Sequence, residues 1–196
     1  MAPLAAAGGI VLVALAPDRG SRIAAAIYLA ASLLLFSTSA IYHRFTWGPR
    51  GEAILRRWDH ANIYLFIAAT YTPIAVLMLS PNSAALLLTI IWSAAVAGLL
   101  FRLCWLGAPR WLYTALYLAM GWAALFWLPQ IFVNGGGAVF TPIIVGGVVY
   151  TIGAVVYARK SPDPSPTWFG YHEIFHACTI LAFTAQYVAI SIAEYS

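Results

Sequence analysis

Long uninterrupted apolar runs are the feature of this sequence that most restricts its fold. The run over residues 22–42 covers about twenty positions, the length that an α-helix needs to cross a bilayer. Only 8% of the 196 residues are charged, whereas a soluble domain averages about 25%. Within lipid, backbone polar groups must be satisfied internally, which leaves helical bundles or closed barrels. Because the runs are continuous rather than alternating, we predict an all-α integral membrane protein.

Seven such runs follow one another between short polar, glycine-containing or proline-containing connections. The sequence therefore predicts a single seven-helix membrane domain over residues 1–196. The expected spans are residues 2–16, 22–42, 58–79, 84–103, 111–128, 139–158 and 168–193. The first run is short, but no basic segment or cleavage site marks it as a signal peptide. We interpret it as a span whose start is shallow or missing.

Proline and glycine residues within these runs indicate how the helices pack. Pro73 predicts a kink in the third span, because proline removes a backbone hydrogen bond. Gly146, Gly147 and Gly153 in the sixth span predict close approach by another helix. Residues 134–137, which read Asn-Gly-Gly-Gly, predict a turn between the fifth and sixth spans.

The distribution of basic residues predicts the orientation in the membrane. Arg19 and Arg22 fall on one side of the expected topology, and the other eight basic residues fall on the opposite side. These eight are Arg44, Arg50, Arg56, Arg57, Arg102, Arg110, Arg159 and Lys160. Basic residues favour the cytoplasmic side, so we expect a cytoplasmic amino terminus and an external carboxyl terminus. We expect a multi-pass protein of the plasma or inner membrane, with no nucleic-acid partner because the charges form no patch.

Three of the four histidines and one acid collect at span ends on the expected cytoplasmic side. His43 ends the second span, Asp59 begins the third, and His172 and His176 begin the seventh. The spacing of His172 and His176 is about 400° of helical rotation, so both imidazoles leave one helix face about 6 Å apart. Ionisable groups in membrane spans are costly and usually mark function. Three imidazoles suit Zn²⁺, which in catalytic sites keeps a fourth position for water.

Two oxygen-bearing side chains belong to the same expected site. Asp59 is the expected general base, acting on a water whose pKa zinc lowers, or else a direct metal ligand. Ser39 lies four residues before His43 on the same helix face and could serve as a supporting or oxyanion donor. Simpler interpretations remain open: headgroup anchoring for the histidines, an arginine partner for Asp59, and a helix carbonyl for Ser39. His60 projects about 100° away from Asp59, and we interpret it as structural or supporting.

Residues 172–176, His-Glu-Ile-Phe-His, also fit the H-E-x-x-H helix of zinc proteases, in which the glutamate is the general base. Here the motif begins a membrane span, where Glu173 can instead be a first-turn acid favoured by the helix dipole. An intramembrane metalloprotease also needs a distant acidic ligand, a role that Asp59 could take. The protease therefore stays an alternative.

Three motifs in order resemble the hemolysin III family, bacterial relatives of the progestin and adipoQ receptors, which include the adiponectin receptors. They are S-T-S-A-I-Y-H-R-F, R-R-W-D-H-A-N-I-Y-L-F-I-A-A-T-Y-T-P-I and F-G-Y-H-E-I-F-H. The resemblance covers essentially the whole chain and implies a seven-helix bundle with a cytoplasmic amino terminus. It implies zinc held by His43, His172 and His176, with Asp59 on the water and Ser39 in support. Eukaryotic relatives have glutamine at the position of Glu173, which argues against the protease.

The resemblance also implies an activity. In the receptor relatives it points to ceramide-type amide hydrolysis, so we expect a zinc-dependent hydrolase acting on a membrane lipid amide or ester. Two other classes remain open: a receptor-like or membrane-homeostasis protein with structural zinc, and a cytolysin, as the family name implies. The chain has no toxin-like amphipathic segment, which argues against the cytolysin.

Overall fold

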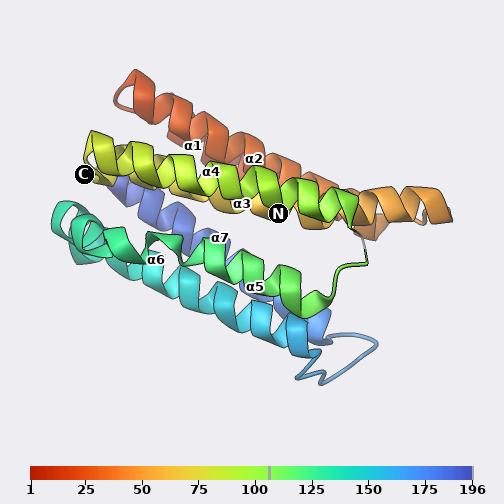
Figure 1. The fold of residues 1–196 in the computed structure, drawn as a ribbon. Helices are drawn as coiled ribbons and strands as arrows, with labels where there is room; N and C mark the ends of the chain where they lie inside the picture. Colours follow the sequence, from red (N-terminus) through yellow and green to blue (C-terminus); the bar gives the residue numbers. More distant parts are fainter. Residues whose placement is uncertain (106, 196) are drawn as a thin grey trace. The chain divides into compact units, whose positions relative to one another are not determined.

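The computed structural model describes residues 1–105 and 107–195, and every regular element among them is a helix. The elements are α1 (Ala2–Leu15), α2 (Arg19–Arg44), α3 (Pro49–Met78), α4 (Pro81–Cys104), α5 (Arg110–Gly121), the 3₁₀ helix η1 (Ala123–Trp127), α6 (Leu128–Arg159) and α7 (Tyr171–Tyr195) (Figure 1). The prediction of an all-α protein is confirmed. Internal contacts divide the chain into two compact units, residues 1–108 with Tyr195, and residues 109–194. The single domain over residues 1–196 stays a prediction.

Five helical stretches of the described chain are long and apolar enough to cross a membrane. They are Arg19–Arg44, Pro49–Met78, Pro81–Cys104, Arg110–Arg159 and Tyr171–Tyr195. The first helix, α1, is apolar but has 14 residues, fewer than the about 20 of a comfortable span. The count of seven spans and the orientation of the termini therefore stay predictions.

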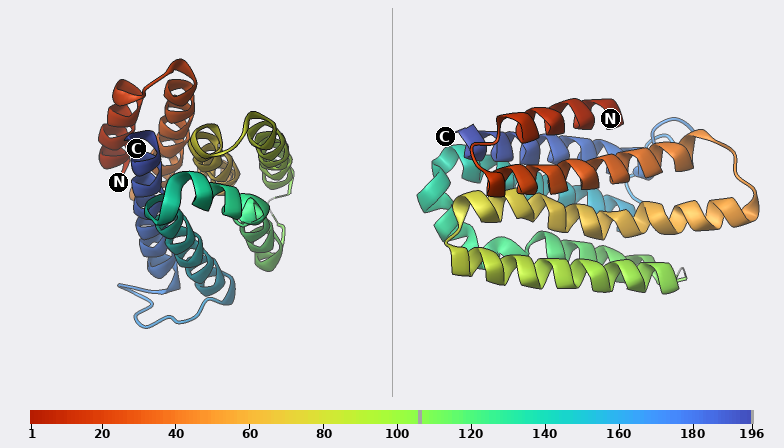
Figure 2. Two further views of the ribbon diagram at one scale, coloured as in Figure 1. Left: turned by 90° about the vertical axis from the view of Figure 1, so that its left-hand side faces the viewer. Right: turned by 90° about the horizontal axis from the view of Figure 1, so that it is seen from above.

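The predicted fifth and sixth spans both lie within the stretch Arg110–Arg159. A straight helix of 50 residues would be about 75 Å long, more than twice the hydrocarbon thickness. The backbone is non-helical at Gly136, with φ 61° and ψ −170°, a conformation that glycine adopts without steric cost. Since α5 packs against α6, the chain reverses between them (Figure 2). The expected turn at residues 134–137 contains this break.

In the first unit, α1 packs against α2, α2 against α3, and α3 against α4 (Figures 1 and 2). Side-chain hydrogen bonds join neighbouring helices: Asn62 Nδ2 donates to Thr38 Oγ1 over 3.1 Å, and Trp92 Nε1 donates to Thr72 Oγ1 over 3.2 Å. Asn62 is only 1% exposed, so its amide depends on protein partners. These bonds hold α3 between α2 and α4.

The start of α3 differs from the sequence prediction. Residues 44–57 were expected to form a loop, but the helix begins at Pro49, nine residues before the expected span. Proline is favoured at the first helical position because its φ is already helical, and Glu52 adds an acid to the first turn. With 30 residues, α3 is about 45 Å long, so its basic first turns extend beyond the length that crosses the apolar core.

Arg102 lies within α4, as the expected span over residues 84–103 predicted, and it is one of the eight basic residues expected on the cytoplasmic side. It is 3% exposed, and its Nη1 donates to the carbonyl oxygen of Trp105 over 3.4 Å. A cation in the last turn of a helix interacts favourably with the helix dipole, which allows α4 to continue through Arg102 to Cys104.

In the second unit, glycines allow α6 and α7 to approach closely, as the sequence predicted. A Cβ added to Gly153 would lie 2.7 Å from the Cβ of Cys178, so no larger residue fits without movement. A Cβ at Gly146 would lie 2.9 Å from Nε2 of Gln186, which itself donates to the carbonyl oxygen of Ile143 over 3.4 Å. Small residues at such contacts are typical of helices that pack in membranes.

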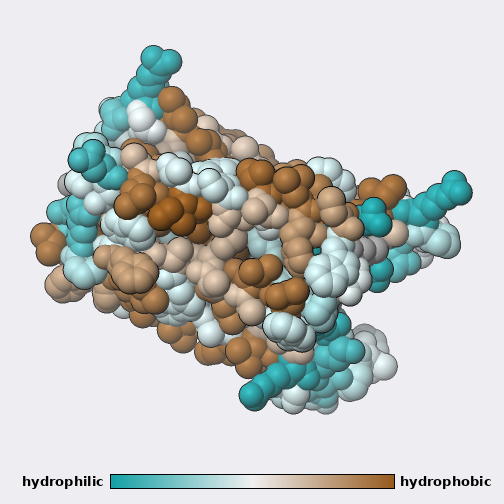
Figure 3. Space-filling view, in the orientation of Figure 1, coloured by the Kyte–Doolittle hydropathy of each residue, from teal (hydrophilic) through white to brown (hydrophobic). Residues whose placement is uncertain are grey.

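Large apolar side chains remain exposed along the helices. Phe126 is 88% exposed and Val133 is 79% exposed, and many leucine, isoleucine and valine side chains are also open. Hydrophobic residues cover much of the helix surfaces in Figure 3, while hydrophilic residues gather toward helix ends. Apolar surface of this extent is suited to contact with lipid rather than with water.

Candidate metal and acid–base site

The first unit brings together three of the expected site residues. Ser39 and His43 lie on the last turns of α2, four residues apart and therefore on one helix face. Asp59 lies on α3, which packs against α2. The Nε2 atom of His43 is 3.9 Å from Oδ2 of Asp59, and the Ser39 hydroxyl lies within hydrogen-bonding reach of the same carboxylate.

Burial differs sharply between the two ionisable members of this group. The Asp59 side chain is 14% exposed, whereas the His43 side chain is 38% exposed. A sheltered carboxylate is costly unless polar partners stabilise it, and Ser39 and His43 are suitable partners. The 3.9 Å gap exceeds the 2.7–3.2 Å usual for a direct hydrogen bond, so Nε2 of His43 and Oδ2 of Asp59 are neighbours without a direct hydrogen bond between them.

His60 lies beside Asp59 but is oriented by its own helix. Its Nδ1 is 2.8 Å from the carbonyl oxygen of Arg56 and 4.0 Å from Oδ2 of Asp59. Because a carbonyl oxygen only accepts, Nδ1 of His60 carries the proton in this contact. Among the described residues, the Asp59 carboxylate therefore lies within ion-pair distance of two histidines, His43 and His60, rather than of a neighbouring arginine.

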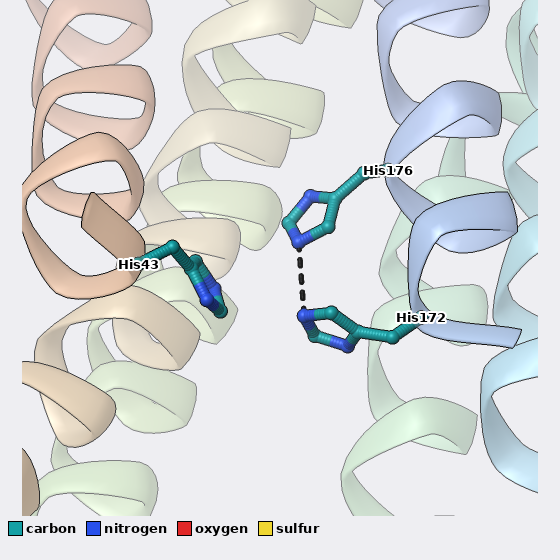
Figure 4. Close-up of side chains that lie close together, drawn as sticks. All are labelled: His43, His172 and His176. Atoms are coloured by element: carbon teal, nitrogen blue, oxygen red, sulfur yellow. Dashed lines mark hydrogen bonds between the residues drawn. The ribbon is translucent and has the colours of Figure 1, made fainter. Parts of the chain in front are cut away.

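The second unit contributes a pair of imidazoles from α7. The Nε2 atoms of His172 and His176 lie 3.0 Å apart, and the ring centroids are 4.6 Å apart (Figure 4). With zinc–nitrogen bonds of about 2.0–2.1 Å, two ligands of a tetrahedral ion are separated by about 3.3 Å. The two nitrogens therefore already lie within a few tenths of an ångström of that separation, so the pair fits a metal ion.

Two carboxylates fix the start of α7 and thereby the positions of these histidines. Glu173 Oε2 accepts a hydrogen bond from the backbone N–H of Gly170 over 2.9 Å. Asp163 Oδ1 accepts from the backbone N–H of Tyr171 over 3.1 Å. Both contacts satisfy donors at a helix amino terminus, where negative charge is also favoured by the dipole. Glu173 therefore has a helix-capping contact, which agrees with the interpretation of a first-turn acid.

His172 and His176 qualify as candidate metal ligands by their own geometry in the second unit, and His43 lies beside Asp59 in the first. The sequence pattern named all three, as well as Asp59 and Ser39. It did not single out Arg110 or Tyr157, which contact Tyr171 and His172, respectively, at the start of α7. One feature of the sequence could have indicated a special role for Arg110. It is a cation at the first position of a helix, where the helix dipole disfavours positive charge, so contacts outside that helix are expected to stabilise it.

Apolar helices, exposed apolar side chains and sheltered polar groups define an integral membrane protein with several spans and a candidate histidine metal site. The chain belongs to the haemolysin-III related family, whose sequence profile matches residues 1–187. The resemblance seen in the three motifs is thereby confirmed.

Individual relatives agree with this assignment. The chain is 32% identical to the Hemolysin-3 homolog of Bacillus subtilis (strain 168) over 146 residues, which are 74% of this chain and 68% of that protein. It is 30% identical to Hemolysin-3 of Bacillus cereus over 163 residues, 81% of this chain and 74% of that protein. It is 25% identical to the human monocyte to macrophage differentiation factor over 187 residues, 93% of this chain and 75% of that protein.

Proposed function

We propose that His43, His172 and His176 hold one Zn²⁺ ion and that the protein hydrolyses an amide or ester bond of a membrane lipid. The observation that carries this proposal is the 3.0 Å approach of the Nε2 atoms of His172 and His176, since two converging imidazole nitrogens form a suitable half of a zinc site. In this proposal His43 supplies the third nitrogen. A sheltered carboxylate, Asp59, then lies beside one of the ligands.

Each residue of the group has a defined role in the proposed hydrolysis. When bound, zinc supplies a Lewis acid for the carbonyl oxygen and lowers the pKa of water in its coordination sphere. Asp59 takes a proton from the attacking water and passes it to the leaving nitrogen or oxygen. Ser39, within hydrogen-bonding reach of the carboxylate, holds it in one orientation. The carbon–nitrogen or carbon–oxygen bond breaks, which yields a carboxylic acid and an amine or alcohol.

The substrate class follows from the surroundings of the chain. Its helices lie in the bilayer and expose large apolar side chains, so lipid acyl chains are the molecules that they meet most often. The resemblance to the receptor branch favours an amide of the ceramide type within this class. The bundle would then receive the acyl chain directly from the membrane.

The test uses the full chain purified in detergent and transferred to lipid nanodiscs. Metal content is measured by elemental analysis, and turnover of a ceramide-type amide and of an ester lipid is measured by mass spectrometry. We expect Asp59→Asn to retain the metal while turnover falls by about 10²–10⁴-fold, and His176→Ala to lose both. Glu52→Gln, in the first turn of α3, serves as the charge-matched control and is expected to keep both.

The outcomes separate the competing functions. A wild-type protein that holds the metal but turns over no lipid faster than Asp59→Asn contradicts the hydrolase and favours a receptor-like protein with structural zinc. A wild-type protein without stoichiometric metal contradicts the metal site itself.

A second candidate comes from the name of the Bacillus cereus relative, Hemolysin-3. If the chain is a cytolysin, it releases haemoglobin from erythrocytes at its native expression level, and Asp59→Asn does so equally well. Lysis that appears only on strong overexpression would count against this function.

A further inference from the structure

Arg110 connects three helices of the second unit. It is the first residue of α5, and its Nη1 donates to the carbonyl oxygen of Tyr157 on α6 over 3.2 Å. Its guanidinium carbon lies 4.7 Å from the ring centroid of Tyr157 and 5.6 Å from that of Tyr171 on α7. The same guanidinium donates to the Tyr171 hydroxyl. Both rings are thus within the about 6 Å range of cation–π contacts.

The position of Arg110 is unfavourable for its own helix but favourable for α6. A cation at the amino terminus of α5 is opposed by the helix dipole. The Tyr157 carbonyl, however, belongs to the last turn of α6, and the carbonyl groups of a last turn lie at the negative end of the helix dipole. Arg110 satisfies that carbonyl and places a positive charge at the negative end of α6. Its location is explained by these contacts rather than by α5 alone.

Tyr157 extends this arrangement to the histidine pair. Its ring centroid lies 4.9 Å from that of Phe175 and 6.1 Å from that of His172. The Tyr157 side chain is also hydrogen-bonded to Tyr113 of α5. The Tyr157 side chain therefore contacts Arg110 and Tyr113 of α5 and three rings of α7, those of Tyr171, His172 and Phe175.

We propose that Arg110 and Tyr157 are positioning residues for His172. Arg110 fixes the Tyr157 ring against α7, and that ring limits the orientations of the His172 imidazole, so that its Nε2 faces His176 before a metal binds. Holding a ligand in place in advance reduces the entropy lost on binding. This inference rests on the proposed function in one respect, because it requires that the α7 histidines bind a metal.

The test measures Zn²⁺ affinity of the full-length protein in detergent, by competition with a chromophoric chelator, and the visible absorption spectrum of the Co²⁺-substituted protein. We expect Arg110→Ala and Tyr157→Leu to weaken Zn²⁺ binding by about 10–100-fold, the usual effect of removing a group that orients a metal ligand. The Co²⁺ bands are expected to shift in both variants, because they report ligand geometry.

Conservative and control variants separate positioning from general damage. Tyr157→Phe keeps the ring and the backbone carbonyl. We therefore expect its Zn²⁺ affinity to lie within about threefold of the wild-type affinity, whereas loss of a positioning group is expected to weaken the affinity by about 10-fold or more. Arg110→Lys keeps the charge but not the planar stack and should give intermediate affinity. Arg159→Ala, an exposed arginine at the end of α6, is the matched control and should leave affinity and spectrum unchanged.

Each outcome has a distinct meaning. If wild type binds no metal, the proposed function fails and this inference with it. If wild type binds Zn²⁺, and both Tyr157→Leu and Tyr157→Phe bind it as tightly as wild type does, only the positioning role is overturned. Thermal unfolding of each variant is followed in parallel, and should Arg110→Ala fail to fold, the two Tyr157 variants decide the question alone.

Discussion

The Nε2 atoms of His172 and His176 lie 3.0 Å apart on consecutive turns of α7. Neutral imidazoles at this distance share one proton, with one ring donating and the other accepting. A metal ion would replace that hydrogen bond and use both lone pairs at once. The pair therefore differs by geometry as well as by spacing from His60, whose Nδ1 contacts the carbonyl oxygen of Arg56.

Replacement of a paired histidine should remove the metal, whereas replacement of His60 should not. His176→Ala takes away one of the two converging nitrogens, and we expect Zn²⁺ affinity to fall by more than the about 100-fold that a supporting group can cost. His60→Gln is the matched control, because His60 Nδ1 contacts the carbonyl oxygen of Arg56. Chelator competition on both purified variants checks this, and equal losses in the two would contradict the assignment of His176.

Glu173→Gln should leave both metal content and lipid turnover nearly unchanged. The Glu173 side chain accepts from the backbone N–H of Gly170 over 2.9 Å, and a glutamine oxygen can accept the same bond. We expect turnover within about threefold of wild type, whereas loss of a general base typically costs about 10²–10⁴-fold. A loss of that larger size, with the metal retained, would revive the zinc-protease interpretation of residues 172–176.

The contact between Asn62 and Thr38 should contribute measurably to the association of α2 with α3. Their 3.1 Å hydrogen bond is part-buried, and such bonds between membrane helices average about 0.6 kcal/mol, with a maximum near 1.7. We expect a double-mutant cycle of Asn62→Ala and Thr38→Ala to give a coupling energy in this range. The measurement is reversible unfolding in mixed detergent micelles, and a coupling of zero would show that the bond is not stabilising.

Stability should fall in acid partly through Asp18, which lies just before α2 and outside the spans. Hydrogen bonds from the Ser21 side chain and backbone, and from the backbone N–H of Gly20, hold the pKa of Asp18 below its ordinary value of 3.8. A group whose pKa is lower in the folded state stabilises the fold above its unfolded pKa, and that contribution disappears as pH falls through the folded pKa.

The matching variant is Asp18→Ala, which removes the helix cap as well as the titrating group. We expect a lower melting temperature than wild type at pH 7, and a smaller difference between the two proteins as the pH falls below 3.8 and through the lowered pKa of the wild-type carboxyl. Asp18→Asn keeps a side-chain oxygen that can cap the helix, and its melting temperature at pH 7 should lie between those of wild type and Asp18→Ala. If the difference in melting temperature between Asp18→Ala and wild type stays the same from pH 7 through this acidic range, the role of Asp18 is contradicted.

Much of the fold and of the histidine pair could be predicted from the sequence because both depend on local geometry. Hydrophobic run length indicated the helices, since the bilayer sets a minimum span. The spacing of His172 and His176 placed them on one face, because a helix has a nearly constant rotation per residue. The glycines of residues 146–153 indicated a close helix contact, since only the absence of a side chain permits it.

Contacts between helices required the tertiary structure. Sequence spacing relates Ser39 to His43 within α2, but packing of α2 against α3 brings His43 to 3.9 Å from Asp59. The burial of Arg102 and the position of Arg110 over Tyr157 likewise cannot be read from the chain order, which shows both arginines only as basic residues of the expected cytoplasmic side. The physical reason is that helix geometry follows from the backbone dihedral angles of neighbouring residues, whereas helix contacts depend on side chains far apart in sequence.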